Sequence, residues 1–380
     1  MAAQLITGGR LVTPDGVLDD GWLLVENGVI AALGTGAAPR AEDVVDAAGS
    51  WVVPGFVDIH CHGGGGSAFT DPDPAAVRAA AAAHAAHGTT TMLASLVSRP
   101  VEELASQVAA LREQVEDGVF AGIHLEGPFL SAARCGAHDP AVLRAPDADV
   151  VATLLAAGRG AVRMVTLAPE LDGATRAVRQ LVDAGSIAAI GHTDATESQV
   201  RPAIDAGATV ATHLFNGMRP LHHREAGPIG TLLADDRVTI ELICDLVHLS
   251  PTIVRLAFAH AGPHRTTLVT DAIAAAAAGD GTYDLGGLTV EVHEGIPTLA
   301  DTGALAGSSL TMDRAFRNLI TTCETPITTA VEVTATRPAA LLGLTNTTGR
   351  LAKGLAADLV LLTPSLEVTA VARQGTWLPR

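Results

Sequence analysis

Several histidine and glutamate residues along the chain could bind a metal ion. The segment His60-Cys61-His62 places two imidazoles two residues apart, so both would face the same side of an extended strand. Glu126, His192 and His213 could provide further donor atoms. Neutral imidazole and carboxylate suit a borderline divalent ion such as zinc or iron. These residues therefore indicate metal-dependent chemistry if the fold brings them together.

The middle of the chain alternates short apolar runs with helical stretches rich in Ala, Leu and Val. Near-continuous apolar strands separated by helices are typical of a parallel sheet that is covered on both faces. The sequence therefore predicts an α/β fold with a TIM-like (β/α)8 barrel. The eight runs cover residues 56–59, 91–97, 120–125, 162–167, 187–190, 209–212, 238–243 and 266–270.

A barrel of this kind carries its chemistry at the carboxyl ends of its strands. A lone histidine at a strand end is more often a hydrogen-bonded structural residue than a metal ligand, but a whole set in one pattern favours a metal centre. His124 could support the ligands or only fill the core, and we expect His84 and His87 on the surface of an Ala-rich helix. The polar residues that follow the runs are His60, His62, Glu126, His192, His213, Asp245, His248 and Asp271.

The two chain ends differ from the middle. Short strands are expected at residues 4–7, 22–25, 29–33, 358–363 and 367–371, and Asn27-Gly28 predicts a hairpin. We therefore expect residues 1–52 and 346–380 to form one small β-sandwich domain. Residues 53–345 would form the barrel.

Composition excludes several classes of function. With 48% hydrophobic and 17% charged residues, the 380-residue chain has an ordinary globular composition. A formal net charge of −17 argues against a nucleic-acid partner and against adhesion to anionic membranes. No apolar run is long enough to span a bilayer, and the first residues do not resemble a signal peptide. Together with four scattered cysteines, these observations predict a cytoplasmic protein.

A local basic cluster follows His213 in this acidic chain. It consists of Arg219, His222, His223 and Arg224. A guanidinium fork suits a phosphate group, so the cluster could bind an anionic substrate, although it could also be a solvated loop. The Gly63–Gly66 run lacks the lysine of a phosphate-binding loop, and Lys353 is the only lysine of the chain.

Several motifs resemble known proteins. The segment 54–63 (PGFVDIHCHG) resembles the first-strand motif of the amidohydrolase superfamily. Six further motifs, in chain order, are similar to those of the N-acetylglucosamine-6-phosphate deacetylase family. They are HLEGPF (124–129), GAHDP (136–140), GHT (191–193), THLFNGM (212–218), VTDA (269–272) and GSSLTM (307–312).

The resemblance implies a hydrolase that removes the acetyl group of N-acetylglucosamine 6-phosphate with a hydroxide generated at a metal, in amino-sugar catabolism and cell-wall recycling. Asp271 would be the general acid and base, and His138 would polarise the acetamide carbonyl. One or two divalent ions are implied, with zinc preferred over iron, cobalt, manganese or cadmium. Many amidohydrolases with two metal ions bridge them with a carboxylated lysine on a barrel strand, and Lys353 cannot reach that place. If two ions are present, Glu126 would have to bridge them. This disfavours the dihydroorotase, hydantoinase and urease-like branches. The implied metal ligands are Glu126, His192 and His213, with His60 and His62 at a second site.

The resemblance also implies a set of substrate contacts. Arg224 and His248 would bind the phosphate, and one of them could cross the interface of a homodimer or homotetramer. Gly217 would act through its backbone, so alanine there should matter little. Cys135 could contact the substrate, gate the site or be a passive loop thiol. Residues 307–309 could lie near the ligand or could simply cap a helix. The implied contacts are Ala137, His138, Asn216, Gly217, Arg224, Asp245, His248, Ala306, Gly307 and Ser308.

Two alternatives remain open at this point. The chain could be another amidohydrolase that acts on an N-acyl substrate or a related amide, such as an aminoacylase or a nucleobase deaminase, which would not depend on Arg224. It could also be a non-catalytic relative that binds a metal or a sugar phosphate, against which the full ligand set and Asp271 argue.

Overall fold

The computed structural model describes residues 3–379, and the chain divides into two compact units. One unit contains the residues up to Asp58, Ala82–Thr91 and the residues from Thr311 on, and the other contains Ile59–Ala81 and Met92–Leu310. The domain boundaries 1–52 with 346–380 and 53–345 stay a prediction. Residues 1, 2 and 380 of those ranges lie outside the described residues.

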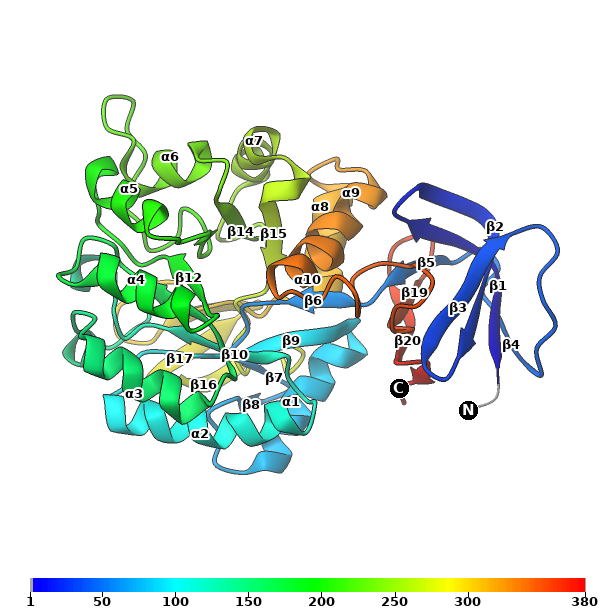
Figure 1. Ribbon diagram of the computed structural model, residues 1–380, viewed down its shortest axis with the longest axis horizontal. Coiled ribbons are helices and arrows are strands. Elements are labelled where there is room, and N and C mark those ends of the chain that lie inside the picture. The colour runs from blue at the N-terminus through cyan, green and yellow to red at the C-terminus, as the bar shows by residue number, and fades with distance from the viewer. Residues whose placement is uncertain (1–2, 380) are drawn as a thin grey trace. The chain divides into compact units, whose positions relative to one another are not determined.

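Strands from both chain ends form one eight-stranded sheet in the first unit (Figure 1). Its path is β21-β20-β19-β5-β1-β2-β3, and β4 pairs with β1. The predicted hairpin joins β2 to β3, where Asn27 and Gly28 have φ values of +51° and +80°. Both residues therefore have the positive φ that a two-residue type I′ turn requires. The strands are β1 (Gln4–Thr13), β2 (Gly16–Glu26), β3 (Val29–Thr35), β4 (Asp43–Asp46), β5 (Trp51–Pro54), β19 (Leu359–Leu362), β20 (Val368–Arg373) and β21 (Thr376–Trp377).

Apolar side chains from both chain ends share one core in this sheet. Ile6, Leu23 and Ile30 from the amino-terminal strands are fully buried with Leu359 from the carboxyl-terminal end. The same unit contains four helical segments near the carboxyl end, and Phe316 on the first of them packs against Phe56 with ring centroids 5.2 Å apart. The segments are α8 (Met312–Thr321), α9 (Ile327–Val331), a π-helical turn (Glu332–Thr336) and α10 (Arg337–Leu341).

The second large sheet has eight strands in the order β6-β9-β10-β11-β12-β13-β14-β15. Each predicted apolar run is one of these strands, the β9–β15 neighbours pair in parallel, and the predicted barrel fold is confirmed. The strands are β6 (Phe56–Asp58), β9 (Thr89–Leu96), β10 (Gly122–Glu126), β11 (Val162–Leu167), β12 (Ile187–Ile190), β13 (Val210–Ala211), β14 (Thr239–Ile243) and β15 (Thr266–Val269).

The barrel closes at the carboxyl ends of its first and last strands. The main-chain N–H of Asp271 donates to the carbonyl of His60 at 2.8 Å, and Cys61 forms a parallel bridge with Ala272. The residues that follow β6 and β15 are therefore fixed side by side. This closure brings the first predicted ligands next to Asp271.

Helices lie around the strands (Figure 1). The first residue of each helix marks the end of the loop that precedes it. The side chain of Ser250 accepts the N–H of Ile253 at the start of α7, and Pro251 occupies its first position. This cap ends the loop that carries His248. The helices are α1 (Pro74–Ala86), α2 (Val101–Glu116), α3 (Ala148–Gly158), α4 (Ala174–Asp183), α5 (Glu197–Asp205), α6 (Gly227–Ala234) and α7 (Pro251–Ala261).

Two features of the fold were not predicted. After β15 the chain forms a three-stranded antiparallel sheet of β16 (Gly281–Leu285), β17 (Leu288–His293) and β18 (Ile296–Leu299). His84, which we expected on the surface, is buried because it shares the inner face of α1 with Val77 and Ala80. Among the described residues, no helix combines the length and the apolarity needed to cross a membrane.

Candidate metal centre and active site

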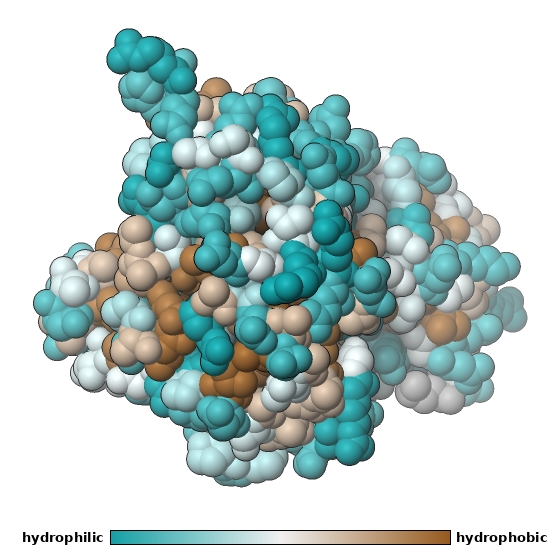
Figure 2. Space-filling model, turned by 60° about the vertical axis from the view of Figure 1, so that its left-hand side comes forward, coloured by the Kyte–Doolittle hydropathy of each residue, from teal (hydrophilic) through white to brown (hydrophobic). Residues whose placement is uncertain are grey.

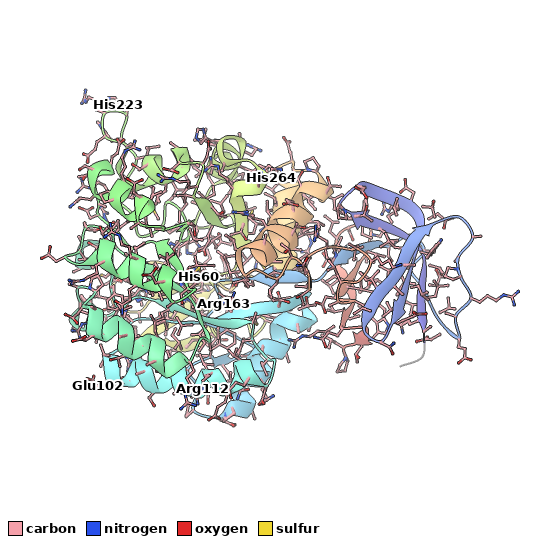
Figure 3. All side chains as sticks on the ribbon, viewed as in Figure 1. His60, Glu102, Arg112, Arg163, His223 and His264 are labelled. Atoms are coloured by element: carbon pink, nitrogen blue, oxygen red, sulfur yellow. The ribbon has the colours of Figure 1, made fainter. Side chains whose placement is uncertain are left out.

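Sharp turns after three barrel strands aim polar side chains into the barrel mouth. His192, His213 and Asp271 follow β12, β13 and β15 with φ values of +47°, +28° and +49°. Non-glycine residues rarely adopt this left-handed backbone, and it occurs often at functional sites. His60 lies among the barrel strands in Figure 3, and all these side chains are buried or nearly so. The strand ends thus converge as the sequence predicted.

Three donor atoms form a compact first group, Glu126 with His192 and His213. Glu126 Oε1 lies 3.1 Å from His192 Nε2 and 2.9 Å from His213 Nε2, and the two nitrogens are 3.1 Å apart. Ligand atoms at about 2.0–2.2 Å from a tetrahedral ion are separated by about 3.3–3.6 Å, slightly more than these distances. The donor set and its spacing therefore fit one divalent ion such as zinc.

A second group shares the same glutamate and contains His60, His62, Glu126 and Asp271. His60 Nε2 lies 3.1 Å from His62 Nε2 and 3.3 Å from Asp271 Oδ1. Glu126 Oε2 lies 3.2 Å from His62 Nε2, whereas its Oε1 faces the first group. One carboxylate thus contacts both groups, which is the arrangement that a bridging glutamate needs.

The ring orientations leave the inner nitrogens available to an ion. His192 Nδ1 lies 2.8 Å from the carbonyl oxygen of Arg134, which can only accept, so the Nδ1 proton points away from the centre. Within the described part of the chain, Nδ1 of His62 and of His213 are buried without a hydrogen-bond partner. Every one of these rings directs Nε2 toward a carboxylate of the centre.

The electrostatics of the centre couple its acids to its bases. Burial lowers the pKa of His60, but the carboxylates of Asp271 and Glu126 outweigh burial and raise this pKa well above its ordinary value. The pKa values of His62 and His192 are raised in the same way. Burial raises the pKa of Asp271, yet the neighbouring histidines lower it overall. Without an ion, the centre therefore holds protons on His60, His62 and His192 and negative charge on Asp271.

His138 lies beside the centre in a defined tautomer. The main-chain N–H of Ser98 donates to His138 Nδ1 at 3.2 Å, so Nδ1 is an acceptor and the proton of the neutral ring is on Nε2. That Nε2 lies 3.3 Å from Glu126 Oε2, in the mouth of the cavity. Burial lowers the pKa of His138, which favours the neutral ring. His138 therefore presents a neutral N–H donor next to the metal donors.

One cavity collects most of the predicted substrate contacts. Asn216, Gly217, His248 and Gly307 line it, together with Ala137, and so do the metal donors other than His60. The sequence did not single out the apolar part of the lining, Val97, Leu285 and Leu305. Leu285 ends β16, so the unexpected three-stranded sheet contributes to the wall. The paired glycines after Leu285 are a hairpin signal that could have revealed it.

The other predicted contacts do not line the cavity. Asp245 accepts the main-chain N–H of His248 and lies 2.6 Å from His248 Nδ1, so it orients that ring. The main-chain N–H of Ser308 donates to the carbonyl of Asp271 at 2.7 Å. Ala306 is buried in the core beneath the three-stranded sheet. Cys135 is half-buried, and its carbonyl accepts the N–H of His138.

The basic cluster after His213 does not line this cavity. Arg219 is paired with Asp194 at 2.9 Å and with Glu225 at 3.1 Å, which occupies its charge. His223 lies at the tip of a projecting loop in Figure 3, and Figure 2 shows this projection as hydrophilic. Arg224 on the same loop is exposed and does not line the cavity of its own chain.

The sequence did not single out two buried residues of the centre. Glu241 in β14 is fully buried and contacts His60 and His213. Ser98 holds His138 through both its main-chain N–H and its hydroxyl. Glu241 is the one charged residue of the run 238–243, and that exception is a signal that could have found it.

Gly217 is more constrained than the sequence suggested. It has a φ of +60°, and a Cβ atom there would lie 2.8 Å from His192 Nδ1. Our expectation that alanine would matter little is wrong on this geometry, because the added methyl group would press on the ring of a metal donor. Glycine is required both for the backbone conformation and for the close approach.

The fold and the ligand groups are those of a metal-dependent hydrolase, and comparison with known sequences agrees. The amidohydrolase family matches residues 51–378, so the chain belongs to the amidohydrolase family.

Individual relatives cover nearly the whole chain. A solved structure of N-acetyl-D-glucosamine-6-phosphate deacetylase from Mycobacterium smegmatis is 47% identical over 99% of both chains, with a TM-score of 0.95; it is an aspartate-to-alanine mutant in complex with N-acetyl-D-glucosamine-6-phosphate. N-acetylgalactosamine-6-phosphate deacetylase from Escherichia coli O157:H7 is 35% identical over 98% of both chains. N-acetylglucosamine-6-phosphate deacetylase from Bacillus subtilis (strain 168) is 33% identical over 98% of this chain and 96% of the other.

Proposed function

We propose that this chain is a metal-dependent deacetylase that converts N-acetylglucosamine 6-phosphate and water to glucosamine 6-phosphate and acetate, in amino-sugar catabolism and cell-wall recycling. The observation that carries the proposal is the buried group of Glu126, His192 and His213, which opens into the same cavity as Asp271 and His138. Similarity to the Mycobacterium smegmatis deacetylase over nearly the full length supports this substrate.

Each part of the reaction has a residue suited to it. A divalent ion at these donors would lower the pKa of a water molecule to about 7 and supply hydroxide at neutral pH. Asp271 takes the proton of the attacking water and passes it to the departing nitrogen. The Nε2–H of His138 donates to the developing oxyanion, and one such donor is worth about 3–4 kcal/mol.

The donor atoms support zinc as the ion. Imidazole nitrogens and a carboxylate without thiolate suit zinc, and they also accept iron, cobalt, manganese or cadmium. Because Glu126 belongs to both donor groups, the centre has room for one or two ions. The first group, with His192 and His213, is the main site in this proposal.

The phosphate is captured by His248 and, in an oligomer, by the partner subunit's Arg224. Burial lowers the pKa of His248, but its hydrogen bond with Asp245 outweighs burial and raises this pKa, so His248 can carry charge near neutral pH. None of the described residues that line the cavity is an arginine or a lysine. Arg224 is exposed and follows His223 on a projecting loop (Figure 3), which supports our proposal that it serves a neighbouring chain of a homodimer or homotetramer.

Mixed oligomers test this arrangement. Arg224→Ala chains and Asp271→Asn chains are each assayed alone and after co-expression. If Arg224 acts across the interface, a hybrid dimer has one intact site, so the mixture should regain activity that neither variant has. If the mixture shows only the sum of the two separate activities, Arg224 acts within its own chain or not at all.

A substrate panel tests the proposed activity. Acetate release is measured for N-acetylglucosamine 6-phosphate, N-acetylgalactosamine 6-phosphate and unphosphorylated N-acetylglucosamine. We expect the phosphorylated glucosamine derivative to have the highest kcat/KM and the unphosphorylated sugar to be poor. A preference for the galactosamine epimer would favour a second candidate function, which the Escherichia coli relative suggests. Failure to deacetylate any phosphosugar would leave another N-acyl substrate or a non-catalytic binding protein.

A cytoplasmic location is part of the same proposal. No disulfide joins the four cysteines, and three of them are buried, which suits a reducing compartment. Fractionation of cells that express the protein at its natural level would test it.

A further inference from the structure

A carboxylate beneath the metal donors has contacts that the proposed reaction does not use. Glu241 lies in β14 and is fully buried. Its Oε2 accepts the main-chain N–H of His213 at 3.1 Å and lies 3.3 Å from His60 Nδ1. Its own carbonyl accepts the N–H of Leu214 at 2.9 Å. One residue on the seventh barrel strand thus contacts the ends of the first and sixth.

The contact with His60 determines which nitrogen of that ring carries the proton. An ionised carboxylate only accepts hydrogen bonds, so the neutral ring of His60 places its proton on Nδ1. The lone pair of Nε2 then points to His62 Nε2 and Asp271 Oδ1, at 3.1 and 3.3 Å. Carboxylate partners of this kind hold a histidine in the tautomer that binds metal.

The burial of Glu241 shows that this contact matters. A carboxylate out of water is costly unless it is paired and hydrogen-bonded. Glu241 Oε1 has no hydrogen-bond partner within the described residues, so the compensation for burial rests on Oε2 and its two partners. Apart from the N–H of His213, the ring of His60 is the group within hydrogen-bonding distance of the Glu241 carboxylate among the described residues.

We propose that Glu241 is a positioning residue that makes the second donor group, His60 with His62, Glu126 and Asp271, competent to bind an ion. This inference rests on the proposed metal-dependent function and deepens it. Glu241 touches neither the ion nor the substrate, and it acts through the ring of His60. The first donor group depends on Glu241 through the main chain of His213, because the hydrogen bond between the two residues uses the N–H of His213 and not its ring.

The test counts bound ions without substrate. Metal-free wild type, Glu241→Leu and Glu241→Gln are titrated with Co²⁺, and both binding affinities are read from visible absorption and calorimetry. We expect wild type to bind two ions. Glu241→Leu should keep the first ion and bind the second about 10–100-fold more weakly, as for other lost supports of metal ligands. Glu241→Gln keeps an accepting oxygen and should lose much less.

A spectroscopic readout separates positioning from general damage. ¹⁵N-histidine spectra of the metal-free protein, recorded at alkaline pH where the ring of His60 has lost its second proton and with His60 assigned from His60→Asn, should show the Nδ1–H tautomer in wild type and in Glu241→Gln. If Glu241→Leu does not fold, the tautomer and the second-ion affinity of Glu241→Gln and Glu241→Asp decide the matter.

Several outcomes would overturn the proposal. They are a Glu241→Leu protein with two ions at wild-type affinity, equal weakening of both ions, a single ion in wild type, and an Nε2–H tautomer of His60. Because no substrate is involved, an inactive protein that binds two ions would refute only the proposed function. An active wild type with one ion would refute only the role of Glu241.

Discussion

At the scale of single residues, the centre depends on how a few side chains divide their contacts. Glu126 directs Oε1 to His192 and His213 and Oε2 to His62. His138 is held by Ser98 as a neutral donor beside it. A hydrogen bond from outside the cavity thus sets which nitrogen of His138 carries the proton. Substitutions of such supporting residues should change the chemistry of the site more than the stability of the fold.

Replacement of Asp271 tests the proton-transfer role. Asparagine has nearly the same shape but cannot accept the proton of the attacking water, so Asp271→Asn should lower kcat by about 10²–10⁴-fold, as for other lost general bases. Metal analysis of the same sample should show that the ion at Glu126, His192 and His213 is retained. Asp236→Asn, on the surface, is the matched control. Near-normal turnover of Asp271→Asn would contradict the role.

The pair of Asp245 and His248 predicts a pH dependence of substrate affinity. The hydrogen bond with Asp245 outweighs burial and raises the pKa of His248, so the cation persists above the ordinary value of about 6.5 and is lost as pH rises through the raised pKa. KM for the phosphosugar should therefore increase with pH in that range. In Asp245→Asn the increase should begin at lower pH, with little change in kcat. Superimposable KM profiles would show that His248 does not bind the phosphate.

At the scale of elements, the loops after the barrel strands do more than connect. His192, His213 and Asp271 all have positive φ directly after a strand, and each turn is braced by main-chain hydrogen bonds, such as that of Ser308 to Asp271. Asp194 also accepts from Arg134 and Arg219, which joins the loop of His138 to the loop of Asn216. The site is therefore carried by several braced turns.

Substitution of Gly217 tests this bracing. Alanine at a φ of +60° costs about 1 kcal/mol of backbone strain, and its methyl group would also push on His192 Nδ1 at 2.8 Å. We expect Gly217→Ala to bind the first metal ion more weakly than wild type. Gly303→Ala is the matched control, because Gly303 has a φ of +70° but no atom within 4 Å of the added carbon. Equal effects of the two variants on metal affinity would show that strain alone matters.

The barrel could be predicted from sequence because its strands are buried on both faces and read as continuous apolar runs. Strand β14, for example, is buried at all five positions. The three-stranded sheet could not be predicted in this way, since β16 is mostly exposed and its sequence resembles a loop. Its contribution to the cavity through Leu285 arises only from tertiary packing.

The candidate metal donors could be predicted as a set because barrel topology brings strand ends together. The hydrogen bonds and ion pairs between distant side chains could not be predicted from the sequence. In the sequence Arg219 appears to be an unpaired cation. In the structure it forms ion pairs with Asp194, which is 25 residues away, and with Glu225. Glu241 appears to be an oddity in an apolar strand until its contact with His60, 181 residues away, is seen.

At the scale of the whole molecule, a buried set of acids and bases links metal binding to stability. Without an ion, the pKa values of His60, His62 and His192 are raised. Protonation of these histidines therefore stabilises the folded protein. This contribution is complete below about pH 6.5 and is lost as pH rises through the raised pKa values. Metal binding needs neutral imidazoles and strengthens over the same range. The two forms of the protein should therefore respond to pH in opposite ways.

Thermal unfolding of chelated and zinc-loaded protein between pH 6 and pH 9 measures this difference. We expect the Tm of the metal-free protein to fall as pH rises from about 6.5, so that the gap to the zinc-loaded protein widens. A His60→Asn variant should show a smaller fall in its metal-free form. A gap that narrows with rising pH would be inconsistent with histidines as the ligands.

The most direct test of the whole account is a zinc titration of the metal-free protein with N-acetylglucosamine 6-phosphate present. Bound zinc and released acetate are measured in the same samples. Convergence of Glu126, His192 and His213 on one catalytic ion predicts no acetate release without metal and a rate that rises in proportion to bound zinc until the first site is full. Full acetate release by metal-free protein, or none by protein saturated with zinc, would contradict the account.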